Sequence, residues 1–318
     1  MFSDAKWVWM DGKMVPWQDA TVHVSSHALH YGTGVFEGIR CYLAVDGPAI
    51  FRLDAHLDRL FNSADAYSIK IAYTKEELAD VICEVIRKNG FESCYIRPIC
   101  YYGSAVLGLV ANRCPLRTAV LAWPWAAMHG NQSLEQGVRM TVSRWVKFHS
   151  GMMPTTAKAC GQYVNSVLAA QEAVKKGYDD ALLLDDDGYV TEATGENIFV
   201  VKKGHVITND AEHSILMGVT RDSAITIARD LGYPVEIRAI EMQDVLSADE
   251  VFMTGTAAEV TPVRSIDEHT AGSGRRGPIT AEIQRVFFDA VYGRDARYRR
   301  WLHFVNAPAN KAVAPAVS

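Results

Sequence analysis

Alternating apolar and polar residues open the chain and predict a β-hairpin. The segment WVWMDGKMVPW, residues 7–17, alternates on both sides of Asp11-Gly12, a dipeptide that favours a tight turn. Helical spacing follows in residues 54–68, where one face of the predicted helix carries Ala55, Leu57, Leu60, Phe61 and Ala64.

The end signals of a second helix are equally clear. Thr74 and Glu77 have the spacing of a capping box, and Gly90 follows the last apolar position of the segment. Residues 93–103 and 118–125 are rich in β-branched and aromatic side chains, so we expect a strand in each. The first part of the chain is therefore predicted to mix helices and strands.

From Met128 to Gln136 the pattern gives way to polar residues and glycine, which we interpret as a connection between two domains. The second part again mixes both element types. Strands are expected at 141–145, 181–185, 197–208 (a hairpin around Lys203-Gly204) and 250–255, and helices at 163–177, after Thr220 and at 280–292.

This order predicts an α/β (α+β) fold of two domains. The expected limits are a small N-terminal domain 1–127, an interdomain loop 128–137 and a large C-terminal domain 138–306. Residues 307–318 consist mostly of Ala, Pro and Val, and we expect them to form a flexible tail.

Composition narrows the function classes. The formal net charge of the 318 residues is -5, which argues against nucleic acid or an acidic membrane as partner. The sequence has no apolar run of the roughly 20 residues that a membrane helix needs, and its first residues lack the apolar segment of a signal peptide, so we do not expect secretion. Six cysteines occur without a CxxC pair, so we expect no metal site and a cytoplasmic location.

Four segments carry candidate chemistry. PTTAKACGQY (154–163) sets Lys158 among small residues before a helix, and GYVTEATGENIF (188–199) sets Glu192 before a small-residue turn. LMGVTRD (216–222) has a threonine at the start of a helix, where backbone amides bind anions, and MTGTAAEV (253–260) joins a strand to a turn. Each also has an ordinary explanation, such as a solvated lysine, a bulge or a helix N-cap.

Together, in this order, these segments resemble the class IV aminotransferases of fold type IV. HALHYGTGVFEGIRCY (27–42) and YIRP (95–98) narrow the resemblance to the branched-chain-amino-acid aminotransferases, and it extends from about residue 7 to 306. The resemblance implies reversible transfer of an amino group from Leu, Ile or Val to 2-oxoglutarate. The cofactor would be pyridoxal 5'-phosphate, which cycles through pyridoxamine 5'-phosphate in a ping-pong mechanism.

The resemblance also implies roles for individual residues. Lys158 would be the catalytic Schiff-base lysine, Tyr163 would bond to the phenolic oxygen of the cofactor, and Glu192 would pair with its pyridinium nitrogen. The cofactor phosphate would be held by Arg59, Val219, Thr220 and Thr256. The other cofactor-binding positions would be Gly195, Glu196, Asn197, Leu216, Gly218 and Gly255.

The implied substrate site must accept an apolar side chain and also the distal carboxylate of glutamate. An unpaired carboxylate in an apolar pocket would cost several kcal/mol, so the resemblance gives it Tyr31 and Arg97 as partners. The α-carboxylate would be bound by Tyr95 and the amides around Thr256 and Ala257. Further substrate-binding positions would be Phe36, Gly38, Arg40, Trp125 and Met128.

Two departures from the family pattern concern the substrate range. Many bacterial members have a tyrosine where this chain has Met128, and the loop 104–112, which in this family reaches the neighbouring subunit's site, differs in length and residues. The resemblance implies a homodimer at least, with a trimer of dimers as the larger alternative.

Three other functions stay open on the sequence. A transaminase for D-amino acids or (R)-amines, or an aminodeoxychorismate-type lyase, would share the lysine. A phosphate-binding module without catalysis would not need the set of Lys158, Tyr163 and Glu192.

Overall fold

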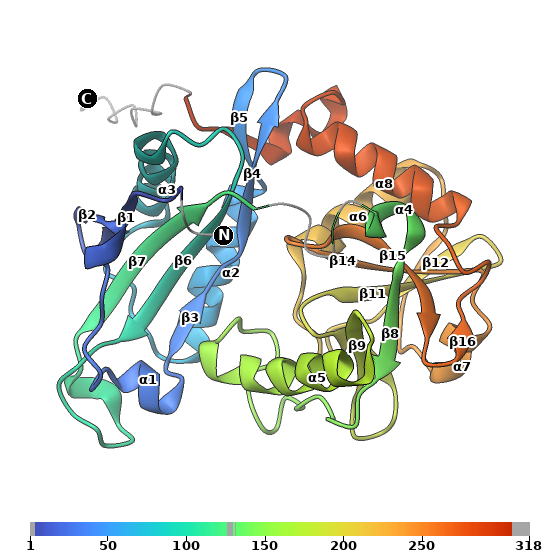
Figure 1. Ribbon diagram of the computed structural model, residues 1–318, viewed down its shortest axis with the longest axis horizontal. Helices are drawn as coiled ribbons and strands as arrows, with labels where there is room; N and C mark the ends of the chain where they lie inside the picture. Colours follow the sequence, from blue (N-terminus) through green and yellow to red (C-terminus); the bar gives the residue numbers. More distant parts are fainter. Residues whose placement is uncertain (1–3, 126–129, 131, 307–318) are drawn as a thin grey trace, which may run out of the picture.

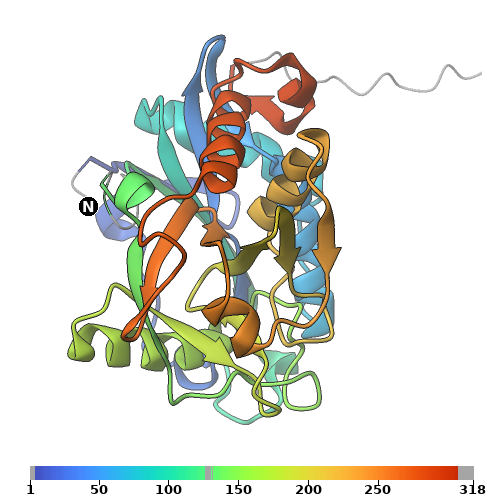
Figure 2. The same cartoon turned by 90° about the vertical axis from the view of Figure 1, so that its right-hand side faces the viewer.

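The computed structural model describes residues 4–125, 130 and 132–306. Two β-sheets lie side by side, each with helices packed against it (Figure 1). The view turned by 90° shows the α5 helix below and the α8 helix above the second sheet (Figure 2). The chain builds most of the first sheet, then the second, and returns to the first with its last strand.

The first sheet has eight strands in the order β17-β5-β4-β6-β7-β1-β2, with β3 paired to β6 beside β4. All its neighbouring strands are antiparallel. Its strands are β1 Trp7–Met10, β2 Lys13–Pro16, β3 Gly34–Phe36, β4 Ile39–Ala44, β5 Gly47–Phe51, β6 Cys94–Tyr102, β7 Leu116–Trp123 and β17 Leu302–Phe304.

Two helices build the core of this half. The α2 helix, Leu53–Ala66, packs on β3 and on α3, and the α3 helix, Lys75–Asn89, packs on β1, β6 and β7. Their apolar faces meet the sheet in a buried cluster that includes Leu57, Leu60, Ile82 and Ile96. The short α1 helix, His27–Tyr31, and the 3-10 turns Trp17–Asp19 and Ala111–Arg113 lie in the connections.

The second sheet has nine strands in the order β10-β9-β8-β15-β14-β11-β12-β13, with β16 paired to β15. It mixes parallel and antiparallel neighbours. Its strands are β8 Val138–Val142, β9 Asp180–Leu184, β10 Val190–Ala193, β11 Asn197–Lys202, β12 His205–Thr208, β13 Val235–Ile237, β14 Glu250–Gly255, β15 Glu259–Ile266 and β16 His269–Thr270.

Helices cover this sheet and join it to the first. The α6 and α8 helices pack on each other and on β14 and β15, α5 packs on β9, and α7 packs on β11. The bounds are α4 Ser133–Gln136, α5 Tyr163–Lys176, α6 Val219–Asp230, α7 Met242–Leu246 and α8 Pro278–Val291, with 3-10 turns at Cys160–Gln162 and Ala296–Trp301.

One apolar cluster spans both halves of the molecule. Tyr42 and Phe51 from the first sheet share it with Phe199 and Phe252 from the second and with Phe287 of α8. Because these side chains are buried together, the two sheets are packed through a common core. None of the helices in the described ranges has the length and apolar character needed to cross a membrane.

Most elements expected from the pattern are confirmed. The 7–16 hairpin is formed, and α3 has the Thr74–Glu77 capping box and ends at Gly90 in a left-handed conformation. Three expectations differ in detail. Gly218 is the N-cap of α6, so Thr220 lies inside its first turn, and the expected connection 128–137 contains the one-turn helix α4. The strand expected at 141–145 is β8, which begins earlier, at Val138, and ends at Val142.

The strand β17 was not expected from the sequence pattern. Residues 302–304 were assigned to the C-terminal domain 138–306, but they pair with β5 in the first sheet. A three-residue strand has too few positions to show an alternating pattern, so nothing in the pattern indicated it. The domain limits remain a prediction.

Candidate active site

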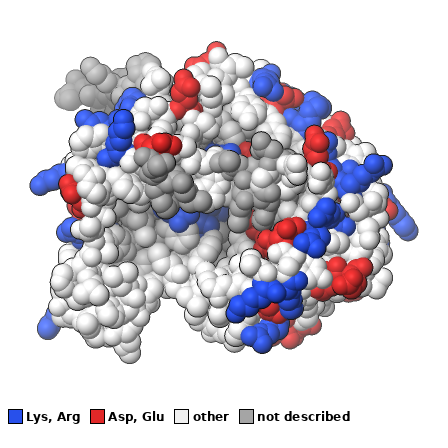
Figure 3. Space-filling view, viewed as in Figure 1, with Lys and Arg blue, Asp and Glu red and all other residues white. Residues whose placement is uncertain are grey.

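A cavity of about 220 Å³ lies between the two halves. Figure 3 shows a hollow between the halves, with basic side chains at its floor. The residues that line the cavity are Phe36, Gly38, Arg59, Tyr95, Arg97, Trp125, Lys147, Lys158, Tyr163, Glu192, Thr194, Gly195, Glu196, Asn197, Leu216, Gly218, Val219, Thr220, Thr254, Gly255, Thr256 and Ala257.

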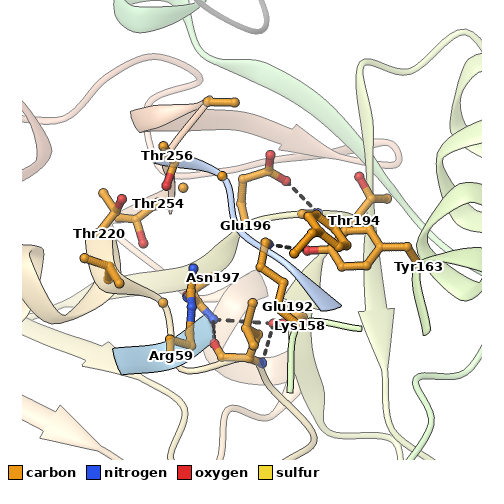
Figure 4. Close-up of a pocket in the computed structure, with 18 of the residues that line it drawn as sticks. Arg59, Lys158, Tyr163, Glu192, Thr194, Glu196, Asn197, Thr220, Thr254 and Thr256 are labelled. Atoms are coloured by element: carbon orange, nitrogen blue, oxygen red, sulfur yellow. Dashed lines mark hydrogen bonds between the residues drawn. The ribbon is translucent and has the colours of Figure 1, made fainter. Parts of the chain in front are cut away.

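Lys158 is fixed through its backbone, and its amine lies in the cavity. Its amide donates to the Ser63 hydroxyl at 2.9 Å, and its carbonyl accepts from the amide of Phe36 at 3.1 Å. Its Nζ donates to the hydroxyl of Tyr163 at 2.5 Å (Figure 4). Burial, and next the charge of Arg59, lower the pKa of Lys158 to about 8. A larger fraction of the amine is therefore neutral, and so nucleophilic, than in an ordinary lysine.

Tyr163 opens the α5 helix and faces this amine. Burial, and then the negative charge of Glu192, raise the pKa of the Tyr163 hydroxyl, so it keeps its proton at neutral pH. The ring packs edge-on against Phe36, with 4.9 Å between the ring centres. This hydroxyl can therefore serve as a fixed hydrogen-bond partner beside the amine.

The Glu192 carboxylate sits in a buried set of donors. Lys147 Nζ lies 2.6 Å from its Oε1, the amide of Leu216 donates to its Oε2 at 2.9 Å, and Asn197 Nδ2 lies 3.4 Å from the same oxygen. Asn197 faces Glu192 across the β10–β11 pair and also donates to the carbonyl of Leu216 at 2.8 Å. The carboxylate is thus held in one orientation with a cation beside it.

An anion-binding corner forms where the start of α6 meets Arg59. The first amides of an α-helix have no partner inside the helix and attract negative charge. Gly218 caps α6 without a side-chain hydrogen bond, and Val219 and Thr220 follow in the first turn. Thr256, on the turn after β14, lines the same cavity.

Arg59 is aimed at this corner by a buried carboxylate that the sequence analysis did not single out. Arg59 Nε and Nη2 donate to the two oxygens of Glu37 at 2.7 and 2.9 Å, and Nη1 donates to the Met217 carbonyl at 3.0 Å. His56 Nδ1 lies 2.8 Å from Glu37. Although burial raises the pKa of Glu37, the charges of Arg59 and His56 outweigh it and hold that pKa well below its usual range.

The wall from the first sheet combines aromatic rings with one guanidinium. Arg97 lies over the ring of Phe36, with its carbon 4.6 Å from the ring centre, and donates to the hydroxyl of Tyr95 at 3.3 Å. Trp125 packs beside Tyr95. A β-carbon at Gly38 would come within 1.9 Å of the Tyr95 hydroxyl, so only glycine allows this side chain into the cavity.

Glu196 also lines the cavity, near enough to Glu192 to feel its charge. Burial, and then the charge of Asp180, raise the pKa of Glu196 well above its ordinary value. Its Oε2 accepts from the amide of Gly195 at 2.9 Å. Of these two carboxyl groups, Glu192 is the one that has the Lys147 ammonium beside it.

These residues fit pyridoxal 5'-phosphate. The cavity brings together an amine with a lowered pKa, a hydroxyl for the phenolic oxygen of the cofactor, a carboxylate for its ring nitrogen and a positively charged corner for its phosphate. The Thr254 hydroxyl is buried and lacks a hydrogen-bond partner among the described residues, so it adds a free polar group to the same wall. In the described ranges, no cluster of three His, Cys, Asp or Glu is placed to hold a metal ion.

All but three of the residues implied by the resemblance line this cavity. Tyr31 lies outside it, on α1, where its hydroxyl donates to the Leu107 carbonyl at 2.7 Å. Arg40 is buried behind the wall and pairs with Glu259. Met128 is outside the described residues.

Sequence reasoning missed several residues that the fold brings in. Lys147, Thr194 and Thr254 line the cavity. Lys147 is 45 positions away from its partner Glu192, and no local pattern indicates such a pair. Thr194 and Thr254 lie inside the segments that the sequence analysis singled out. For Thr254, the alternation of side chains along β14 was a signal that could have been used.

Comparison with known proteins agrees with this site. A family model for amino-transferase class IV matches residues 34–266. The branched-chain-amino-acid aminotransferase of Pseudomonas aeruginosa is 44% identical over 294 residues, which cover 92% of this chain and 95% of that protein.

Solved structures give the same result. The Escherichia coli branched-chain amino acid aminotransferase has a TM-score of 0.93 and 44% identity, covering 95% of this chain and 100% of that one. A second branched-chain amino acid aminotransferase, solved with pyridoxamine 5'-phosphate, has a TM-score of 0.92 and 47% identity, covering 95% and 99%. The likeness confirms the expected α/β fold of type IV.

The chain belongs to the class IV aminotransferases and, among them, to the family of the branched-chain-amino-acid aminotransferases.

Proposed function

We propose that this enzyme moves the amino group between branched-chain L-amino acids and 2-oxoglutarate, with pyridoxal 5'-phosphate bound in the cavity. The observation that carries the proposal is the Lys158 amine, which is partly buried in the cavity, has a lowered pKa and bonds to Tyr163. Relatives that match nearly the whole chain are named branched-chain-amino-acid aminotransferases, which supports the same activity.

The residues divide the work according to their chemistry. The cofactor, when bound, supplies an electron sink that makes the α-proton of the amino acid acidic. Lys158 would hold the cofactor covalently at rest and would supply the amine that takes the proton from the α-carbon. Tyr163 would bond to the phenolic oxygen, and Glu192 would favour a proton on the ring nitrogen.

The anion corner is proposed to hold the phosphate. Arg59, the first amides of α6 and the hydroxyls of Thr220 and Thr256 are the donors. Because Glu37 occupies two N–H groups of Arg59, the guanidinium keeps one orientation. A phosphate group in this place would anchor the cofactor in the cavity.

Substrate carboxylates are assigned to two places. The α-carboxylate is proposed to meet the Tyr95 hydroxyl and the amides around Thr256 and Ala257. The distal carboxylate of glutamate is proposed to meet Arg97, which has no carboxylate within ion-pair distance among the described residues and whose Nε is buried without a hydrogen-bond partner. Phe36 and Trp125 offer apolar surface for the side chains of leucine, isoleucine and valine.

The assembly is part of the proposal. The bond from Tyr31 to Leu107 attaches this tyrosine to the loop 104–112. Leu109 and Val110 of that loop are 84% and 68% exposed, which is unusual for large apolar side chains so close together. We propose that the loop and Tyr31 reach the site of a second copy, so that the enzyme is a homodimer at least. The free thiols of the described cysteines fit the cytoplasmic location that we propose.

The first test is to locate the cofactor. Purified protein should be yellow, and borohydride reduction followed by peptide mapping should place the cofactor on Lys158. An adduct on another lysine would contradict the assignment. A panel of amino donors with 2-oxoglutarate should then favour leucine, isoleucine and valine, with L-leucine used and D-leucine not. Release of pyruvate from aminodeoxychorismate would indicate the lyase instead.

A further inference from the structure

The hairpin turn that carries Thr256 and Ala257 ends on a residue with an uncommon backbone. Gly255 and Glu259 are the last paired residues of β14 and β15, so residues 256–258 form the turn. Glu259 has a φ of +60°, in the left-handed region that residues with side chains rarely adopt. Such a conformation costs free energy and persists only where surrounding contacts hold it.

Those contacts come from the other half of the molecule. The Tyr42 hydroxyl donates to Glu259 Oε1 at 3.1 Å, and Arg40 Nη1 lies 3.3 Å from the same oxygen. Arg40 and Tyr42 are two residues apart on β4, so their side chains leave the same face of the first sheet. Glu259 is 3% exposed, and its burial raises the pKa of the carboxyl while the charge of Arg40 lowers it. Burial outweighs the charge of Arg40, so the pKa of Glu259 lies above its ordinary value although Arg40 favours the ionised form.

The same arginine touches the wall of the cavity. Arg40 Nη2 reaches the carbonyl of Trp125 at 3.5 Å, and Arg40 faces Tyr95 across the β4–β6 ladder. The turn itself is fixed on its other side, where the Thr261 hydroxyl donates to the carbonyl of Ala258 at 2.5 Å. The turn is thus held at its end by Glu259 and from inside by Thr261.

We propose that Glu259 is a positioning residue: Arg40 and Tyr42 hold its backbone left-handed, and this aims the amides of the turn 256–258 at the substrate α-carboxylate. The inference rests on the proposed function, which assigns the α-carboxylate to this turn. Glu259 does not line the cavity, so it acts through the turn. If Glu259 relaxed to an ordinary extended backbone, the peptide groups before it would rotate and the amides would lose their direction.

The rival explanation is that the pair of Arg40 and Glu259 only holds the two halves together. That role would affect all substrates equally. We therefore compare L-leucine with 3-methylbutylamine, which has the same branched side chain and amine but no carboxylate. The ratio of the two kcat/KM values measures carboxylate recognition alone.

The ratio is measured by single-turnover absorbance of the pyridoxal form of the enzyme. We expect it to fall about 10-fold in Glu259→Gln and in Arg40→Met, with the reaction of the amine kept within a few-fold of wild type. Tyr42→Phe, which keeps the ring and loses one hydrogen bond, should lower the ratio about 3-fold. Melting curves verify folding, and Tyr42→Phe keeps the test valid if a charge variant does not fold.

The matched control is Asp222→Asn. It breaks the ion pair of Arg52 and Asp222, which also joins the two halves at 2.8 Å but does not touch the turn, and it should leave the ratio unchanged. Equal losses of kcat/KM for L-leucine and 3-methylbutylamine, or an unchanged ratio in the Glu259 and Arg40 variants, would overturn the inference. Equal use of the two amines by the wild type would overturn the proposed carboxylate site itself, before any variant is made.

Discussion

At the scale of single residues, the site depends on charges that the fold removes from water. Glu37 and Glu259 are buried and Lys158 is partly buried, and each has a pKa displaced by loss of solvent and by specific neighbours. Desolvation and an adjacent cation lower the pKa of a lysine, and an adjacent cation lowers that of a carboxyl. The protonation states that the reaction needs are therefore set by packing.

The lowered pKa of Lys158 has a direct consequence. In the cofactor-free protein, competitive labelling with acetic anhydride over a pH series should give Lys158 a midpoint near 8, compared with ~10.4 for an unperturbed lysine. The neutral amine is the reactive form, so labelling rises with pH through that midpoint. Arg59→Met removes a positive neighbour and should move the midpoint upwards. A wild-type midpoint in the ordinary range would show that the amine is solvated.

Glu192→Gln should impair catalysis more than cofactor binding. Glutamine lacks the charge that favours a protonated ring nitrogen, so we expect turnover to fall roughly 10²-fold or more. Cofactor content, measured by absorbance after alkaline release, should fall much less.

Because Glu192 forms an ion pair with Lys147, the Glu192 variant needs a control for the loss of that pair. Removing the Glu192 charge leaves Lys147 buried beside a neutral partner, which itself destabilises the protein. The double variant Glu192→Gln with Lys147→Met removes both charges and should regain stability but not turnover. Recovery of turnover in the double variant would contradict the role assigned to Glu192.

At the scale of elements, helix ends and strand ends bring the polar groups together. The start of α6, the end of β14 and the segment before α5 all point into one cavity, although they come from distant parts of the chain. Figure 4 shows Thr220, Thr256 and Arg59 on one side and Tyr163 on the other. The cavity thus depends on how these element ends are packed.

Gly218→Ala tests the start of α6. A β-carbon at this N-cap would lie 2.0 Å from Asn197 Oδ1, so Asn197 would have to leave its bonds to Leu216 and Glu192. We expect the affinity of the cofactor-free protein for pyridoxal 5'-phosphate, measured by calorimetry, to fall about 10-fold or more. Thr226→Ala changes the same helix outside the cavity and should bind as wild type does. Unchanged affinity in Gly218→Ala would mean that this cap does not shape the anion corner.

Local signals explain which elements were predictable. The capping box of α3 and the Asp11-Gly12 hairpin are complete within a few residues, so the sequence showed them. The site motifs were recognised because each is a continuous segment. Glu37, His56 and Lys147 were missed because their partners come from other segments. A single charged residue in a sequence does not indicate which residues the fold will bring next to it.

At the scale of the whole molecule, β17 forms one edge of the first sheet. Leu302 is buried in the core that spans both halves, and β17 covers the edge of β5. A chain that ends at Trp301 should melt at a clearly lower temperature, because loss of a buried leucine alone typically costs about 2–5 kcal/mol. A chain that ends at Asn306 keeps β17 and is the control. Equal melting temperatures for the two chains would mean that β17 adds nothing.

Because β17 comes at the end of the described chain, β5 must wait for this partner strand while the protein is being synthesised. β5 ends at Phe51, and its neighbour in the sheet starts at Leu302, about 250 residues later. At the usual speed of a ribosome this interval is roughly 12–50 seconds. For that time the edge of β5 has no partner strand, and an uncovered edge can pair with other chains. Crowded polysomes are therefore where this enzyme should depend most on chaperones.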